Sequence, residues 1–170
     1  MRLFIAVRFP EEIRNEILGI MKDLRAQGLK GNFSREENLH LTLAFLGETK
    51  APRPISEAMK AVSFKPFYLE LKESGTFRDL YWVGLKENKE LSEYTKALRQ
   101  ELSGREIWYD SKPFKPHITI VRKGESQQKV KIKVPEAGFW ADKVSLMRSE
   151  RINGKLTYTE IFSVKAQEQI

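Results

Sequence analysis

The chain has 170 residues, enough for one sizeable domain, and its 30 Lys and Arg against 23 Asp and Glu give a formal net charge of +7. It contains no cysteine, which excludes disulfides, thiolate nucleophiles and cysteine-ligated zinc, and its two histidines are too few for a histidine-rich metal site. No apolar run approaches the roughly 18–20 residues of a membrane span, and the N-terminus has no signal-peptide pattern, so we expect a cytoplasmic protein without membrane contact.

Strands and helices alternate along the first half of the chain. Apolar spacing and turn residues predict, in chain order, a strand over 2–9, a helix that begins at Pro10 and ends at Gly28 or Gly31, a strand over 39–46, a short helix around 55–62 and a strand over 67–72 with one wet face.

The second half repeats this order. The same criteria predict a strand over 80–85, a helix closed by Gly104, a strand over 116–123, an alternating strand around 129–134, and two strands over 144–152 and 156–165 joined by the hairpin turn Asn153-Gly154. Long, regular βαβ spacing is missing. The pattern therefore favours an α+β fold with mainly antiparallel strands.

One half of the sequence lies on the other at a single offset. His40 and His117 are 77 residues apart, as are Leu3 and Leu80. At that offset the segments 40–48 and 117–125 align without a gap, and four of the nine pairs are identical. We interpret this as an internal duplication within one domain, 1–170, with halves of roughly 1–78 and 79–170. Each of two sheets is expected to carry one His-x-Thr strand, with helices at the flanks and a cleft between the lobes.

Strand geometry indicates what such a cleft could do. Side chains alternate faces along a strand, so His40 points the same way as Thr42, and His117 the same way as Thr119. If both pairs face one cleft, one imidazole can take a proton while the other gives one, and the hydroxyls can hold a phosphoryl group. This predicts phosphodiester chemistry by acid–base catalysis, without a metal or a cofactor.

These motifs resemble those of the 2H phosphoesterase superfamily, whose signature is a pair of His-x-Thr-x motifs. The strings Arg2-Leu-Phe-Ile-Ala-Val, His40-Leu-Thr-Leu-Ala-Phe-Leu-Gly and Pro116-His-Ile-Thr-Ile-Val-Arg resemble its RNA 2′,3′-cyclic phosphodiesterase branch, historically called 2′-5′ RNA ligase. The resemblance runs along nearly the whole chain. It implies a bilobal α+β duplication with the active cleft between the lobes.

The resemblance also implies a mechanism. His40 would be the proton donor and His117 the proton acceptor, with Thr42 and Thr119 holding the phosphate. The substrate would be RNA with a 2′,3′-cyclic phosphate end, hydrolysed to a 2′-phosphate. Microscopic reversibility would allow a weak, ATP-independent 2′-5′ joining reaction. An ATP-driven ligase is not expected, because the sequence has no phosphate-binding P-loop motif.

Two further residues are candidate substrate-binding residues. Arg122 stands where the family has an arginine that could grip phosphate, and Phe45 could stack on a base. Both are an odd number of residues from their histidines, which places them on the opposite strand face unless the strand bulges. Lys112, Lys115 and Lys123 could guide RNA or be plain solvated lysines.

Two alternative functions stay open at this point. The same histidine pair could act on 2′-5′ linked oligonucleotides or small cyclic nucleotides. A non-catalytic RNA-binding module would also suit the basic charge. We expect a monomer, because the chain has no coiled-coil heptads. Trp82, Trp108 and Trp140 are expected in the core or at the interface of the lobes, and Lys129, Lys131 and Lys133 on the wet side of a strand.

Overall fold

Short apolar runs separated by turn residues fold into two antiparallel sheets in the computed structural model, which describes residues 1–167. The elements follow in the order β1 (Arg2–Arg8), α1 (Glu11–Ala26), β2 (Lys30–Phe33), a 3₁₀ turn (Glu36–Asn38), β3 (His40–Glu48), α2 (Arg53–Lys60), β4 (Phe67–Phe77), β5 (Leu80–Leu85), α3 (Lys89–Gly104), β6 (His117–Glu125), β7 (Gly138–Ala141), β8 (Lys143–Ile152) and β9 (Lys155–Lys165).

Each sheet carries one His-x-Thr strand, as the sequence predicts. The first sheet has the strand order β3-β1-β8-β9, and the second has the order β2-β6-β5-β4-β7. Every pairing within them is antiparallel. The predicted α+β class with two antiparallel sheets is confirmed.

The sequence repeat is visible in the strand order. The run β3-β1-β8 of the first sheet corresponds to the run β6-β5-β4 of the second. Each sheet therefore takes strands from both sides of residue 78, so the sheets exchange strands between the halves of the sequence. The two histidine strands, β3 and β6, repeat at an offset of 77 residues, but their partner strands, β1 and β5, repeat at an offset of 76. Val7 pairs with Leu41 in the first sheet, and Val83 pairs with Ile118 in the second.

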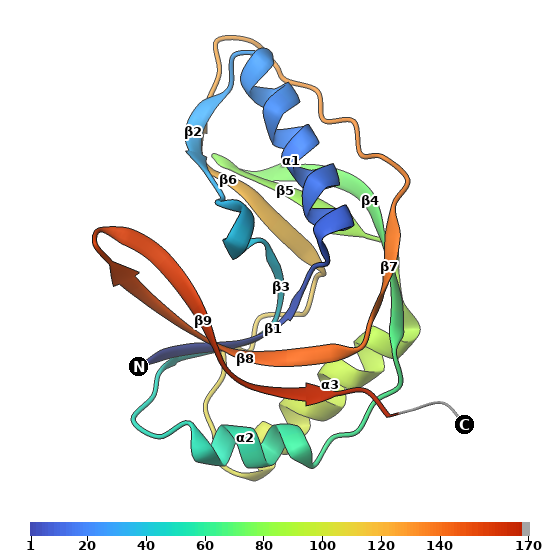
Figure 1. Cartoon of the computed structure of the whole chain (residues 1–170), viewed down its shortest axis with the longest axis vertical. Coiled ribbons are helices and arrows are strands. Elements are labelled where there is room, and N and C mark those ends of the chain that lie inside the picture. Colours follow the sequence, from blue (N-terminus) through green and yellow to red (C-terminus); the bar gives the residue numbers. More distant parts are fainter. Residues whose placement is uncertain (168–170) are drawn as a thin grey trace.

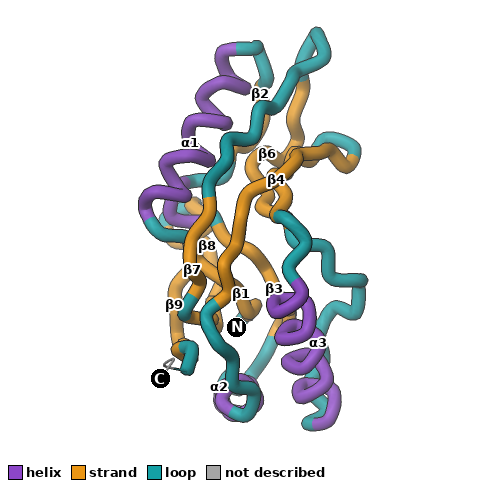
Figure 2. Tube along the Cα trace, turned by 90° about the vertical axis from the view of Figure 1, so that its right-hand side faces the viewer, coloured by secondary structure: helices purple, strands orange, loops and turns teal. Residues whose placement is uncertain are grey.

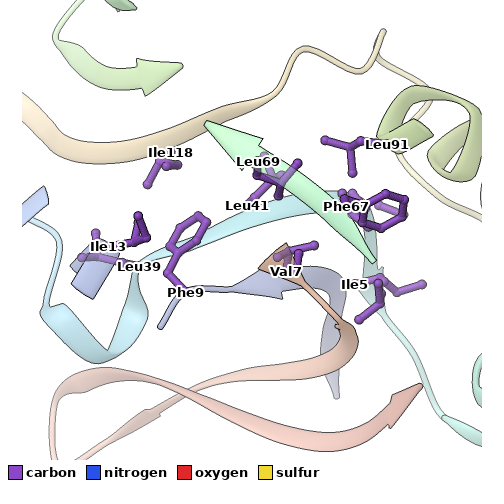
Figure 3. Packing of buried hydrophobic residues seen from close by; sticks show 14 of the residues in the cluster. Ile5, Val7, Phe9, Ile13, Leu39, Leu41, Phe67, Leu69, Leu91 and Ile118 are labelled. Carbon is purple, nitrogen blue, oxygen red and sulfur yellow. The ribbon is translucent and has the colours of Figure 1, made fainter. Parts of the chain in front are cut away.

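The helices cover the faces of the sheets that turn away from the His-x-Thr side chains. Pro10 precedes α1, whose first turn is acidic, and α1 lies along the second sheet, whereas α2 and α3 lie against the first (Figures 1 and 2). Apolar side chains from both sheets and the helices form one large core, part of which is shown in Figure 3. This core holds the two sheets, and hence their His-x-Thr strands, in a fixed relation.

Other expectations were met in part. Asn153 and Gly154 form the β8–β9 turn with positive φ values of 51° and 78°. The strand predicted around 129–134 was wrong: these residues run extended without ladder partners, and Val130, Ile132 and Val134 pack against the core. β2 and β7 were not predicted. Within the described residues, no helix is long and apolar enough to cross a membrane.

The prediction that all three tryptophans lie in the core or between the lobes was wrong for two of them. Trp108 and Trp140 have relative solvent accessibilities of 65% and 63%. Trp140 stands on the edge strand β7, where its ring packs on Tyr68 at 5.1 Å. Trp82 is half-buried.

Candidate functional site

The two histidines open β3 and β6 and are held in the same way. His40 Nδ1 lies 2.7 Å from the carbonyl oxygen of Asn38, and His117 Nδ1 lies 2.6 Å from that of Lys115. A carbonyl oxygen can only accept a hydrogen bond, so Nδ1 carries the proton in both rings. In its neutral form, a ring with this tautomer keeps the lone pair of Nε2 for proton transfer. In His40 this nitrogen accepts from the hydroxyl of Thr42 at 2.9 Å.

Both strands bulge by one residue directly after the His-x-Thr motif. In β3, Thr42 and Ala44 pair with consecutive residues of β1, which leaves Leu43 as the extra residue. In β6, Thr119 and Val121 pair with consecutive residues of β5, which leaves Ile120 as the extra residue. The two bulges lie at equivalent positions of the repeat.

These bulges overturn the expectation that Phe45 and Arg122 face away from the histidines. A bulge shifts the alternation by one residue, so two adjacent buried residues follow each threonine and the next side chain returns to the face of the histidine. Phe45 is half-buried and Arg122 is exposed there. The structure thus places both candidates on the His-x-Thr faces.

The bulge in β3 is held by an arginine from α3. Arg99 donates from Nε and Nη2 to the carbonyl oxygen of Leu43, at 3.1 and 3.0 Å. Its third nitrogen, Nη1, donates to the carbonyl oxygen of Lys112 at 2.8 Å. One guanidinium thereby joins the bulge of β3 to the loop that leads to His117. In β6 a backbone group binds the extra residue instead: the N–H of Ser34 donates to the carbonyl oxygen of Ile120 at 2.9 Å.

Replacing Arg99 by Met is expected to lower the free energy of unfolding by about 1.5–3 kcal/mol, because two carbonyl groups lose a charged donor. Urea unfolding measures this. The matched control is Arg105→Met. Arg105 directly follows the last residue of α3 and pairs with Glu101 at the surface, where an ion pair contributes about 0–1 kcal/mol. Equal effects of the two substitutions would contradict the assigned role of Arg99.

His40 stands in an aromatic, electropositive setting. Its ring centroid lies 4.8 Å from that of Phe4 and 5.2 Å from that of Tyr158. Burial lowers the pKa of His40, and the positive charges of Arg122 and His117 lower it further, against the opposing hydrogen bond to Asn38. Arg122 forms no ion pair with the residues that the structure describes. Its charge is thus available to an anion near His40.

Side chains from both His-x-Thr strands meet at one hollow of about 150 Å³, which we call the Phe45 hollow. It is lined by residues of β3, α3 and the loop before β6: Thr42, Phe45, Arg99, Asp110, Lys112, Pro113, Phe114, Lys115 and His117. Thr42 and Phe45 come from the first sheet and His117 from the second. The two motifs therefore contribute to a shared site.

The surroundings of His117 differ from those of His40. His117 is exposed, and its ring centroid lies 6.5 Å from that of Trp82. Trp82 pairs across the strands with Thr119, so the two side chains share a face. A Cβ atom on Gly75 would lie 2.3 Å from the Trp82 ring, so only glycine admits the ring there. The Trp82 ring therefore packs directly over Gly75 of β4.

Sequence reasoning missed three residues of the candidate site, two beside the histidines and one beside Phe45. Tyr158 contacts the ring of His40, Trp82 stands beside His117, and the guanidinium of Arg2 lies 5.2 Å above the Phe45 ring. They come from β9, β5 and β1. The alternation of each strand gives their face, but only the strand order shows that these faces meet the histidines.

The candidate lysines are placed differently. Lys112 and Lys115 line the Phe45 hollow. Lys123 is exposed and adopts a positive φ of 54° beyond the bulge of β6. Among residues 1–167, no group of three or more His, Asp or Glu side chains is placed to hold a metal ion.

Comparisons with known proteins agree with this geometry. The 2′-5′ RNA ligase superfamily matches residues 9–153. An RNA 2′,3′-cyclic phosphodiesterase of Archaeoglobus fulgidus is 35% identical over 130 residues, 72% of each chain. The Escherichia coli protein of the same name is 30% identical over 172 residues, 94% of this chain and 93% of its own.

Solved structures give the same result for the fold. E. coli LigT complexed with 3′-AMP matches with a TM-score of 0.83 and 25% identity over 98% of both chains. TT0787 of Thermus thermophilus matches with a TM-score of 0.81 and 26% identity over 97% of both chains. The chain therefore belongs to the 2′-5′ RNA ligase superfamily of 2H phosphoesterases, in the family of the RNA 2′,3′-cyclic phosphodiesterases.

Proposed function

We propose that this protein hydrolyses the 2′,3′-cyclic phosphate end of RNA to a 2′-phosphate by acid–base catalysis with two histidines and no metal. The observation that carries the proposal is the matched pair of rings, each with Nδ1 committed to a carbonyl oxygen and Nε2 left for proton transfer. The names of the curated relatives and the net positive charge support RNA as the substrate.

The proposed reaction has one proton taken and one given. His117 Nε2 accepts a proton from water while the water oxygen forms a bond to phosphorus. The bond between phosphorus and the 3′ oxygen breaks, and His40 Nε2 donates its proton to that oxygen. His117 stands in the more open setting, which suits a residue that must reach water. The order of donor and acceptor follows the family resemblance.

The remaining side chains bind the phosphate in this proposal. Thr42 and Thr119 donate their hydroxyl hydrogens to the non-bridging oxygens, and Arg122 supplies a positive charge where negative charge grows in the transition state. Thr42 already lies 2.9 Å from His40 Nε2, so a phosphate oxygen that takes the Thr42 hydroxyl also releases His40 from it.

Substrate binding would also favour the protonated form of His40, which the proton donor needs. In the free protein, burial lowers the pKa of His40 below the ordinary histidine value, and the positive charge of Arg122 lowers it further. An anionic phosphate placed among these groups offsets the positive charges and raises the pKa of His40. The donor is then protonated when the substrate is bound.

With another nucleophile, the same site would join RNA ends. A 5′-hydroxyl in place of water would attack the cyclic phosphate, and release of the 3′ oxygen would leave a 2′-5′ linkage. No ATP enters this reaction, because the energy comes from the cyclic ester. We propose this as a weak secondary activity.

The test is turnover of an RNA oligomer that ends in a 2′,3′-cyclic phosphate, in excess EDTA, with the 2′- and 3′-phosphate products separated by chromatography against standards. We expect conversion to the 2′-phosphate alone. A folded protein that leaves this end intact in EDTA contradicts the proposal. Parallel assays with 2′-5′ linked oligonucleotides and small cyclic nucleotides would then separate another 2H substrate from binding without turnover.

A further inference from the structure

Trp108 exposes a large aromatic surface next to the candidate site. Its relative solvent accessibility is 65%, although it follows the end of α3 closely. A Cβ atom on Gly47 would lie 3.4 Å from Cζ3 of Trp108 and 3.7 Å from Cε1 of Phe45. Gly47, with a positive φ of 66°, therefore lies beneath two neighbouring aromatic rings. One ring lines the Phe45 hollow, and the other stands just outside it.

The backbone around Trp108 is fixed to the site. The N–H of Asp110 donates to the carbonyl oxygen of Phe45 at 2.9 Å, and the N–H of Ile107 donates to that of Leu102 at 2.9 Å. Ile107 and Tyr109 pack against the core on either side. Trp108 is thus held at a set distance from β3 while its own ring is left to solvent.

Both signs of charge lie near this pair of rings. The guanidinium of Arg2 lies 5.2 Å above the Phe45 ring, and Lys112 is exposed at the rim of the hollow, where its Nζ lies 3.9 Å from the carboxylate of Asp110. Arg2 forms no ion pair with the described residues. A flat aromatic surface beside the Arg2 guanidinium, continuous with a site for a phosphate, complements single-stranded RNA.

We propose that Trp108 is a second nucleobase subsite, which stacks on the base preceding the nucleotide that carries the cyclic phosphate. This rests on the proposed function, since it places the reacting nucleotide in the Phe45 hollow, between His117 and Phe45. The chain of the RNA then leaves the hollow across Gly47 and meets the Trp108 ring. Stacking tolerates any base, so the subsite selects for oligomers over mononucleotides and not for a sequence.

The kinetic test compares a 2′,3′-cyclic mononucleotide with a dinucleotide that ends in the same cyclic nucleotide. We expect Trp108→Ala to lower the kcat/KM for the dinucleotide by about tenfold, mainly through KM, and to leave that for the mononucleotide unchanged. Trp108→Phe should restore most of the loss. The matched control is Trp140→Ala, because Trp140 is as exposed but stands on the edge strand of the second sheet, packed on Tyr68. It should leave both substrates unaffected.

A binding measurement separates this proposal from the proposed function. Fluorescence-detected affinities of an unreactive mononucleotide and dinucleotide with 3′-phosphate ends do not depend on turnover. Tighter binding of the dinucleotide that is lost in Trp108→Ala supports the subsite even if no substrate is hydrolysed. Equal affinities in the wild type, or a preference that survives Trp108→Ala, overturn it whatever the activity.

Discussion

Replacing either His40 or His117 by alanine is expected to lower kcat on a 2′,3′-cyclic RNA end by about 10²–10⁴-fold, the usual contribution of a positioned acid or base. Each ring is aligned by a hydrogen bond from Nδ1 to a backbone carbonyl, and alanine removes the only group that can exchange a proton at that point. Single-turnover assays in EDTA measure the chemical step directly.

In the proposed mechanism the two histidines act in one step, so the rate losses of the two substitutions should not multiply in the double variant. The double variant is expected to be little slower than the slower single variant. The wild type is expected to show a bell-shaped pH profile of kcat/KM, and each single variant should lose one limb of it. His117→Ala is the cleaner variant, because His117 is exposed whereas His40 packs against Phe4 and Tyr158. A fully active, folded His117→Ala would remove the two-histidine mechanism.

The sequence repeat predicted the parts of the site that depend on local order. The His-x-Thr pairs, the two sheets and the antiparallel class follow from alternation and from an offset of 77, because these features need only neighbours along the chain. The arrangement of the two lobes could be predicted less well from the sequence. The repeat does not show that β8 joins the sheet of β1 and β3, or that β4 joins the sheet of β5 and β6, because both depend on strand pairing between distant segments.

Phe45 and Arg122 show where alternation fails. Counting faces along β3 and β6 sends both away from the histidines, and one extra residue in each strand returns them. Leu43 and Ile120 are ordinary strand residues, so their types do not mark a bulge. What fixes the β3 bulge is Arg99, which is distant in sequence.

The predictions for Trp108 and Trp140 were wrong for a different reason. A tryptophan is buried on average, and the burial of Trp108 or Trp140 depends on whether an element covers it. The same holds for the segment 129–134, whose alternation is real but whose backbone finds no strand partner. The sequence pattern predicts which face of a strand a side chain occupies, but not which element packs against that face.

Replacing Arg122 by Gln is expected to lower kcat/KM by about 10²–10³-fold, the usual loss when one charged or polar donor is removed from a growing negative charge. It should also raise the pKa of His40, because the charge of Arg122 is among the causes that hold this pKa down. The pKa is measured by NMR titration of the imidazole C–H signal of His40. In the wild type, the midpoint should lie below the ordinary value for histidine.

Lys123→Gln is the matched control for this substitution, since it removes the same charge one residue further along β6, beyond the bulge. It should change neither kcat/KM nor the titration of His40 appreciably. A plain surface arginine at position 122 would behave like Lys123 in both measurements. A raised pKa without a loss of rate would place Arg122 near His40 but not on the phosphate, and the assignment of phosphate binding would then pass to Thr42 and Thr119 alone.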